Sequence, residues 1–199
     1  VSSSLMSHTI GSPPIARAAR PEVKARVLPQ ILSGQKISAL AITEPSGGSD
    51  VANLRTRARR DGDHYVVSGE KTFITSGLRA DHLTVAVRTD PASGGALGLS
   101  LLVIDGDTPG LRRTELKKMG WWASDTAHLH FDRCRVPAAH LVGDVARGQV
   151  QGAHIEEMTR GIIGTRRPVG PAGDAGRHDD ALPGREQHKK IPLQNKKRQ

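Results

Sequence analysis

The sequence predicts a mainly β protein, an antiparallel β-sandwich or barrel flanked by helical segments. Through the middle of the chain, short segments alternate between apolar and polar residues with a period of two. Turn-forming residues separate these segments, and the chain holds 22 glycines and 12 prolines. Short strands at this spacing are typical of sandwiches and barrels.

A helix is expected first, at residues 21–33. Pro21 suits the first turn of a helix, and Gly34 suits its end. The apolar residues between them recur at helical spacing: Val23, Val27, Leu28, Ile31 and Leu32. This helix therefore has one apolar face that must pack on another element. The preceding residues 1–17 are mostly small and polar.

Strands are expected from residue 35 onward, where the period changes to two. Asp61-Gly62-Asp63 is a hairpin signal, and Thr108-Pro109-Gly110 suits a type II turn. Cys134 alternates like a strand residue, which predicts a packing role. The expected strands are residues 37–42, 54–59, 65–67, 70–75, 82–88, 98–104, 127–131 and 134–137. Together they form one domain at residues 35–146.

A second helical segment is expected at residues 147–166, where apolar residues can share one helical face. The helix should end by Pro168, because several glycines and prolines follow it. Residues 167–199 show no periodicity long enough to bury a core, so we expect a basic, disordered tail.

Charge and composition narrow the class of function. Residues 160–199 hold 10 Lys/Arg and 4 Asp/Glu, a surplus of 6 within the net charge of +9. This basic tail has no aromatic residue on which a base could stack, so the prediction is no nucleic acid. No apolar run is long enough for a membrane span, and no signal peptide is evident. With a single cysteine, these features favour the cytoplasm, or the mitochondrial matrix in a eukaryote.

A ligand loop is one interpretation of residues 43–50. Pro45 ends the strand, and Gly47-Gly48 let a polar ligand approach the backbone closely. Thr43 and Ser49 add hydroxyl groups on either side. The alternative is a plain strand-exit turn closed by Asp50. Phe73 has a similar alternative, since an aromatic residue at a strand end is often part of the core.

Three segments together resemble the acyl-CoA dehydrogenase family: Ile42-Thr43-Glu44-Pro45-Ser46-Gly47-Gly48-Ser49-Asp50, then Lys71-Thr72-Phe73-Ile74-Thr75-Ser76-Gly77, then Trp121-Trp122-Ala123-Ser124-Asp125-Thr126 leading to Arg135-Val136-Pro137. The resemblance implies an FAD cofactor and a middle β domain at residues 35–146. It also implies that residues 1–34 end an N-terminal helical domain and that residues 147–166 begin a C-terminal one.

The resemblance assigns roles to particular residues. Phe73 replaces the common Trp that packs against the flavin, and Thr75 hydrogen-bonds it. Ser49 lies near both the cofactor and the acyl-CoA, and Arg160 lies near the CoA-bearing substrate. The residues expected along the flavin are Leu40, Ala41, Ile42, Thr43, Ser49, Phe73, Ile74 and Thr75. Adjacent Trp121 and Trp122 point to opposite faces if extended, so only one is readily part of the core.

The same resemblance implies α,β-dehydrogenation of an acyl-CoA, an electron-transfer flavoprotein as acceptor, and a homo-oligomer. No catalytic residue is identified, because Thr159 stands where some members carry the Glu base, and neither Glu156 nor Glu157 matches. The chain is therefore interpreted as an incomplete form, as a frameshifted reading frame would leave. The alternatives are a non-catalytic flavin-binding or subunit-associating fragment, and an acyl-CoA oxidase or flavin monooxygenase on the same fold.

Overall fold

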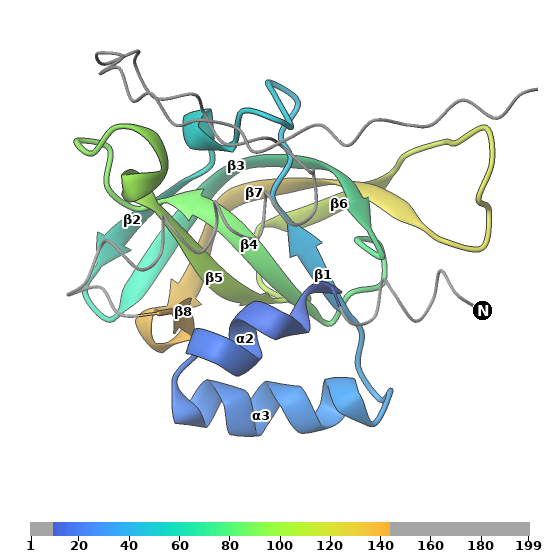
Figure 1. Cartoon of the computed structure of the whole chain (residues 1–199), viewed down its shortest axis with the longest axis horizontal. Helices are drawn as coiled ribbons and strands as arrows, with labels where there is room; N and C mark the ends of the chain where they lie inside the picture. The colour runs from blue at the N-terminus through green and yellow to red at the C-terminus, as the bar shows by residue number, and fades with distance from the viewer. Residues whose placement is uncertain (1–9, 144–199) are drawn as a thin grey trace, which may run out of the picture. The chain divides into compact units, whose positions relative to one another are not determined.

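The computed structural model describes residues 10–143, which belong to the first of two units of the chain, Val1–Arg166. Figure 1 shows two helices against one side of a curled sheet. The helices are α2 (Ser12–Ala18) and α3 (Pro21–Leu32). The strands are β1 (Ser38–Ala41), β2 (Arg57–Asp61), β3 (His64–Thr75), β4 (His82–Arg88), β5 (Leu99–Asp105), β6 (Leu111–Glu115), β7 (Thr126–Pro137) and β8 (Leu141–Val142). Short 3-10 helices occupy Val51–Asn53, Gly95–Gly98 and Ala138–His140.

The strands form one eight-stranded sheet in the order β6-β7-β3-β2-β4-β5-β8, and β1 pairs with β4 off this path. The mainly β prediction is confirmed. Most pairs are antiparallel, but β1 and β2 each run parallel to β4, so the sheet is mixed. The β1–β4 pair can be parallel because the chain passes through β2 and β3 between these strands, instead of turning back directly from β1.

Apolar side chains pack on both faces of the sheet. In β5, Leu102 and Ile104 join the cluster formed by the curled strands, whereas Leu101 and Val103 join the cluster under the helices. Successive strand residues point to opposite faces, so a strand covered on both sides needs a continuous apolar run. This explains why β5 does not alternate with polar residues.

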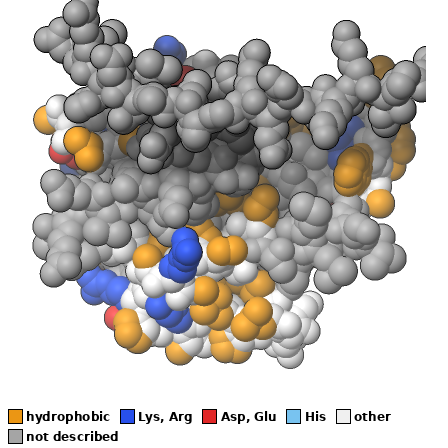
Figure 2. Space-filling model, in the orientation of Figure 1, with side chains coloured by type: hydrophobic (Ala, Val, Ile, Leu, Met, Phe, Trp, Pro, Cys, Tyr) orange, Lys and Arg blue, Asp and Glu red, His pale blue; other side chains and the backbone are white. Residues whose placement is uncertain are grey.

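Helix α3 confirms the predicted helix, with Val23, Val27 and Ile31 buried against the sheet. Leu32 is an exception, since it is exposed rather than packed. Over the helices, hydrophobic and basic side chains both reach the surface (Figure 2). The sequence did not predict α2, which has only seven residues and begins with prolines, too short for a periodic pattern.

Most predicted strands are present, with shifted boundaries. β4 spans residues 82–88 as predicted, and the hairpin at Gly62 joins β2 to β3 through the Asp61–His64 pair. The two segments predicted at 127–137 are one strand, β7, in which Arg133 has a positive φ of 50°. β6 and β8 were not predicted, since β6 is largely exposed and β8 has two residues.

Other sequence predictions fall into two groups. Cys134 is buried in the core, which confirms its packing role. No described helix is long and apolar enough to cross a membrane. The expected helical segment at 147–166 and the tail at 167–199 lie outside the described residues, as does Arg160, so these stay predictions, together with the proposed domain boundaries.

Candidate functional site

The ends of β1 and β3 lie side by side, which joins the two segments that the sequence singled out. The Thr72 amide donates to the Thr43 carbonyl oxygen over 2.9 Å. In return, the Thr43 hydroxyl donates to the Thr72 carbonyl oxygen. Residues 29 positions apart in the chain are thereby held in one structural unit. Because the Thr43 hydroxyl proton is used in this bond, Thr43 offers only oxygen lone pairs to a ligand.

A buried ion pair stabilises this junction. Lys71 is fully buried, and its Nζ donates to Glu44 Oε1 and to the Ile42 carbonyl oxygen, each over 2.9 Å. Glu44 also accepts from the backbone amides of Arg55 and Thr56, at 2.7 and 2.9 Å. A buried carboxylate needs such partners. Lys71 therefore links β3 to the chain that leaves β1, and Glu44 links that chain to the segment leading into β2.

The two charges respond differently to their burial. Desolvation lowers the pKa of Lys71 from 10.5 to about 8, against the opposing influence of Glu44. For Glu44, desolvation raises the pKa, but Lys71 and the amides of Arg55 and Thr56 together outweigh it, so the net pKa is lowered. The carboxylate is thus ionised at neutral pH. Both residues lie in the sequence motifs, but neither was predicted to have a role.

The period of two in β3 could have indicated that Lys71 is buried. Tyr65 and Val67 point into the core, and Lys71 shares their odd-numbered face. A lysine at an inward position needs a buried partner. The sequence does not show which carboxylate binds Lys71, because this depends on how distant segments of the chain pair.

A bulge in β3 turns Phe73 out of the sheet. The register with β7 shifts between Lys71 and Ile74, and Phe73 has a φ of 58°. The Phe73 side chain is 71% exposed, whereas Ile74 is buried in the core. Bulges commonly re-aim a side chain in this way, and an exposed aromatic residue in a left-handed conformation is typical of a binding surface.

The other predicted flavin contacts differ in accessibility. Ala41 is buried in the core, so with Ile74 it can meet a ligand mainly through backbone groups. Leu40, Ile42, Thr43 and Thr75 are partly exposed, and Ser49 is exposed. The structure therefore brings the residues of β1 and β3 together at one site, with Phe73 as its largest exposed side chain.

The tryptophan segment begins just beyond this site. Thr75 of β3 pairs with Thr126, the first residue of β7. The loop before Thr126 exposes Trp121 by 72% and Trp122 by 78%. The expectation that one of them belongs to the core is wrong, because Trp121 has a φ of 59° and the segment is a turn rather than an extended strand.

Within residues 10–143, no group of three or more His, Cys, Asp or Glu side chains could hold a metal ion. The site instead offers an aromatic face, hydroxyl oxygens and backbone groups. These are the groups that bind a flat heteroaromatic ring with polar edges.

Comparisons with known proteins identify the family of this chain. Residues 39–134 match the acyl-CoA dehydrogenase middle domain. Cyclohexane-1-carbonyl-CoA dehydrogenase of Geobacter metallireducens is 40% identical over 168 residues, which cover 83% of this chain and 44% of that protein. Mitochondrial isobutyryl-CoA dehydrogenase of Dictyostelium discoideum is 41% identical, over 64% of this chain and 30% of that protein.

Solved structures show the same likeness. A probable acyl-CoA dehydrogenase from Mycobacterium abscessus superposes with a TM-score of 0.73 at 49% identity, covering 80% of this chain and 42% of that one. An acyl-CoA dehydrogenase from Geobacillus kaustophilus gives a TM-score of 0.72 at 43% identity, covering 78% and 42%. The chain spans less than half the length of these relatives. It carries their middle domain, and it belongs to the acyl-CoA dehydrogenase family.

Proposed function

We propose that this chain supplies the flavin-binding wall of an FAD-dependent acyl-CoA dehydrogenase, an oxidoreductase that forms a Cα–Cβ double bond in an acyl-CoA thioester. The observation that carries the proposal is the junction of β1 and β3, where the bulge in β3 turns Phe73 outward beside Thr43 and Thr75. The relatives named above are dehydrogenases of different acyl-CoA thioesters. The shared chemistry supports the reaction class and leaves the acyl group open.

The residues at the junction fit FAD by their chemistry. Phe73 offers a π face to an aromatic ring system. Thr43 offers an acceptor oxygen, and the Thr75 hydroxyl can donate to a ring oxygen or nitrogen. Bound there, FAD supplies the acceptor for the hydride that leaves the β carbon. The buried Lys71–Glu44 pair orients this surface, because it holds the backbone on either side of Thr43.

Substrate and partners follow from the same proposal. Ser49 lies exposed on the loop after Thr43, where a thioester substrate could be bound beside the cofactor. Arg160 is proposed for the CoA side. An electron-transfer flavoprotein as acceptor, assembly as a homo-oligomer, and a location in the cytoplasm or the mitochondrial matrix remain proposals that rest on the family.

A visible absorption spectrum tests the proposal. Purified protein is mixed with FAD, freed of unbound flavin, and scanned before and after addition of an acyl-CoA under anaerobic conditions. We expect a retained flavin band that bleaches with substrate. A retained band without bleaching would favour the non-catalytic flavin-binding alternative, and bleaching that oxygen rapidly reverses would favour an oxidase or a monooxygenase. Absence of retained flavin would refute flavin binding by this chain.

A pair of variants tests the role of Phe73. Removing this exposed ring by Phe73→Ala should weaken FAD binding about tenfold, since an aromatic stacking partner contributes about 1 kcal/mol or more. Leu97→Ala is the matched control, because Leu97 is also an exposed apolar side chain but lies between β4 and β5. Equal flavin affinity in both variants would contradict the assignment of Phe73.

A further inference from the structure

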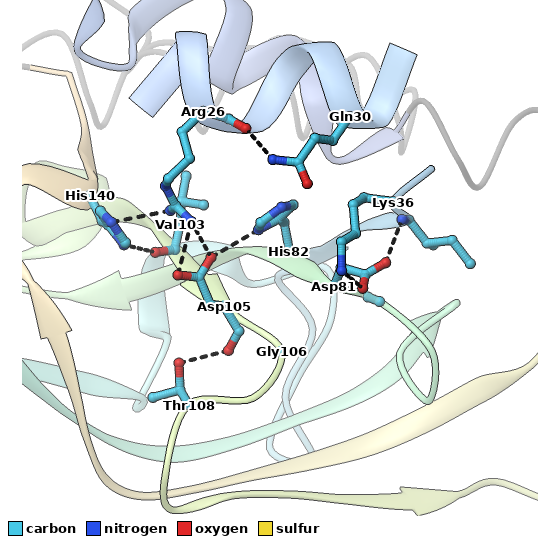
Figure 3. A network of polar contacts seen from close by, with 12 residues as sticks. Arg26, Gln30, Lys36, Asp81, His82, Val103, Asp105, Gly106, Thr108 and His140 are labelled. Carbon is cyan, nitrogen blue, oxygen red and sulfur yellow. Dashed lines mark hydrogen bonds and ion pairs between the residues drawn. The ribbon is translucent and has the colours of Figure 1, made fainter. Parts of the chain in front are cut away.

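A second polar site lies where α3 meets the ends of β4 and β5. It is a cavity of about 540 Å³. Figure 3 shows Arg26 and Gln30 of α3 reaching toward His82 and Asp105, with Lys36 and Asp81 beside them. The proposed flavin surface does not include any of these residues. The lining of the cavity is mostly charged. It includes His82 and Asp105, together with Arg26, Lys36, Arg79, Asp81, Asp107 and Arg113.

Asp105 is at the centre of this network. Both of its carboxylate oxygens accept from Arg26 at 3.1 Å, and Oδ1 also lies 2.9 Å from His82 Nδ1. Arg26 further contacts His140 Nε2 at 3.2 Å. These contacts lower the pKa of the Asp105 carboxyl against its desolvation. The carboxylate is therefore ionised and can only accept, so His82 Nδ1 must carry a proton.

The other ring nitrogen of His82, Nε2, has no hydrogen-bond partner among residues 10–143. The His82 side chain is 7% exposed, and within the described part of the chain Nε2 is the only buried side-chain nitrogen or oxygen without a hydrogen bond. A buried polar atom left unpaired is costly. Since His82 lines the cavity, a molecule bound in the cavity can supply the missing partner.

The cationic side chains around the cavity retain hydrogen-bond donors that are not fully engaged by other described residues. Arg79 binds Asp125 through Nε, and its side chain remains 60% exposed, with no hydrogen bond from its terminal nitrogens to any described residue. Lys36 binds Asp81 at 2.8 Å and is also partly exposed. Arg113 donates to three backbone carbonyl oxygens, and Gly106 leaves room for its guanidinium. Two of the three lining carboxylates are occupied, since Asp105 binds Arg26 and His82, and Asp81 binds Lys36 and the Ile37 amide. The third, Asp107, is exposed.

We propose that this cavity binds a small molecule through an anionic oxygen group, a carboxylate or a phosphate, which accepts hydrogen bonds from His82 Nε2 and from Arg79. His82 then carries protons on both nitrogens, one directed at Asp105 and one at the bound anion. The charged and titratable groups that face His82 are Arg26 from α3, Asp81 next to it, Asp105 from β5 and His140 from the Ala138–His140 turn.

Calorimetric titration of the full chain with inorganic phosphate and with acetate, at constant ionic strength in sodium chloride, tests this site. We expect saturable binding of at least one probe, at one site per chain. The tighter of the two probes identifies whether the group is a phosphate or a carboxylate. Binding of neither probe would overturn the proposal.

Variants locate the site. His82→Asn retains a donor toward Asp105 and removes Nε2, so affinity should fall about tenfold. His64→Asn is the matched control, because His64 also contacts an aspartate through Nδ1 and lies outside the cavity. Arg79→Gln should weaken binding similarly. Because Arg79 is exposed, this substitution should leave the fold intact, so a loss of binding would not reflect unfolding. Equal affinity in His82→Asn and His64→Asn would refute the role of His82.

Discussion

Replacing Lys71 with methionine tests how the buried ion pair contributes to stability. Methionine keeps much of the side-chain length but removes the ammonium that binds Glu44 and the Ile42 carbonyl oxygen. Breaking a buried pair by removing one partner costs about 3 kcal/mol or more, because the other charge remains buried. We therefore expect Lys71→Met to lower the free energy of unfolding by about this amount at pH 7.

The loss should grow as pH rises. The pKa of Lys71 is about 8 in the folded protein and 10.5 in the unfolded reference. Between these values the unfolded state binds more protons, so the wild-type free energy of unfolding rises with pH. At about 1.4 kcal/mol per pH unit, the full window amounts to about 3 kcal/mol. Glu44 stays ionised throughout this range, since its pKa is lowered, and the variant lacks the titrating group.

Urea unfolding followed by far-ultraviolet circular dichroism measures this effect. The difference between wild type and Lys71→Met should widen by about 2 kcal/mol or more between pH 7 and pH 10. Lys117→Met is the control, because Lys117 is exposed. A difference that is constant across this range would refute the burial of a charged Lys71, and a small difference at every pH would refute the ion pair itself.

Three further predictions concern other parts of the fold. Gly69→Ala should destabilise by about 2 kcal/mol or more in urea unfolding, because Gly69 has a φ of 145° and an added Cβ would lie 2.6 Å from Thr56 Cα; a neutral result would contradict this backbone geometry. Desolvation and Arg26 lower the pKa of His140 from 6.5. The contribution of His140 to the free energy of unfolding is therefore complete above pH 6.5 and is lost as pH falls below this value. His140→Gln should flatten the acid side of the plot of urea midpoint against pH, and an unchanged slope would exclude His140 as its cause. Trp122→Ser should change the free energy of unfolding by less than about 0.5 kcal/mol, since the ring is 78% exposed; a larger loss would mean that Trp122 is buried.

Local patterns in the sequence were sufficient for much of the fold. The mainly β class, the helix at Pro21–Leu32, strand β4 and the hairpin at Gly62 all follow from periodicity and turn chemistry. Such features depend on neighbours a few residues away, so they can be predicted from a single amino-acid sequence. The family resemblance rests on the same kind of information, since its motifs are short and contiguous.

The tertiary structure alone determined which distant residues are in contact. Only the folded chain shows that Glu44 meets Lys71, that the bulge turns Phe73 outward, and that both tryptophans are exposed. The cavity at His82 likewise needs α3, β4 and β5 together. No local pattern encodes these juxtapositions, because they arise when strand pairing and burial on both faces of the sheet are satisfied at once.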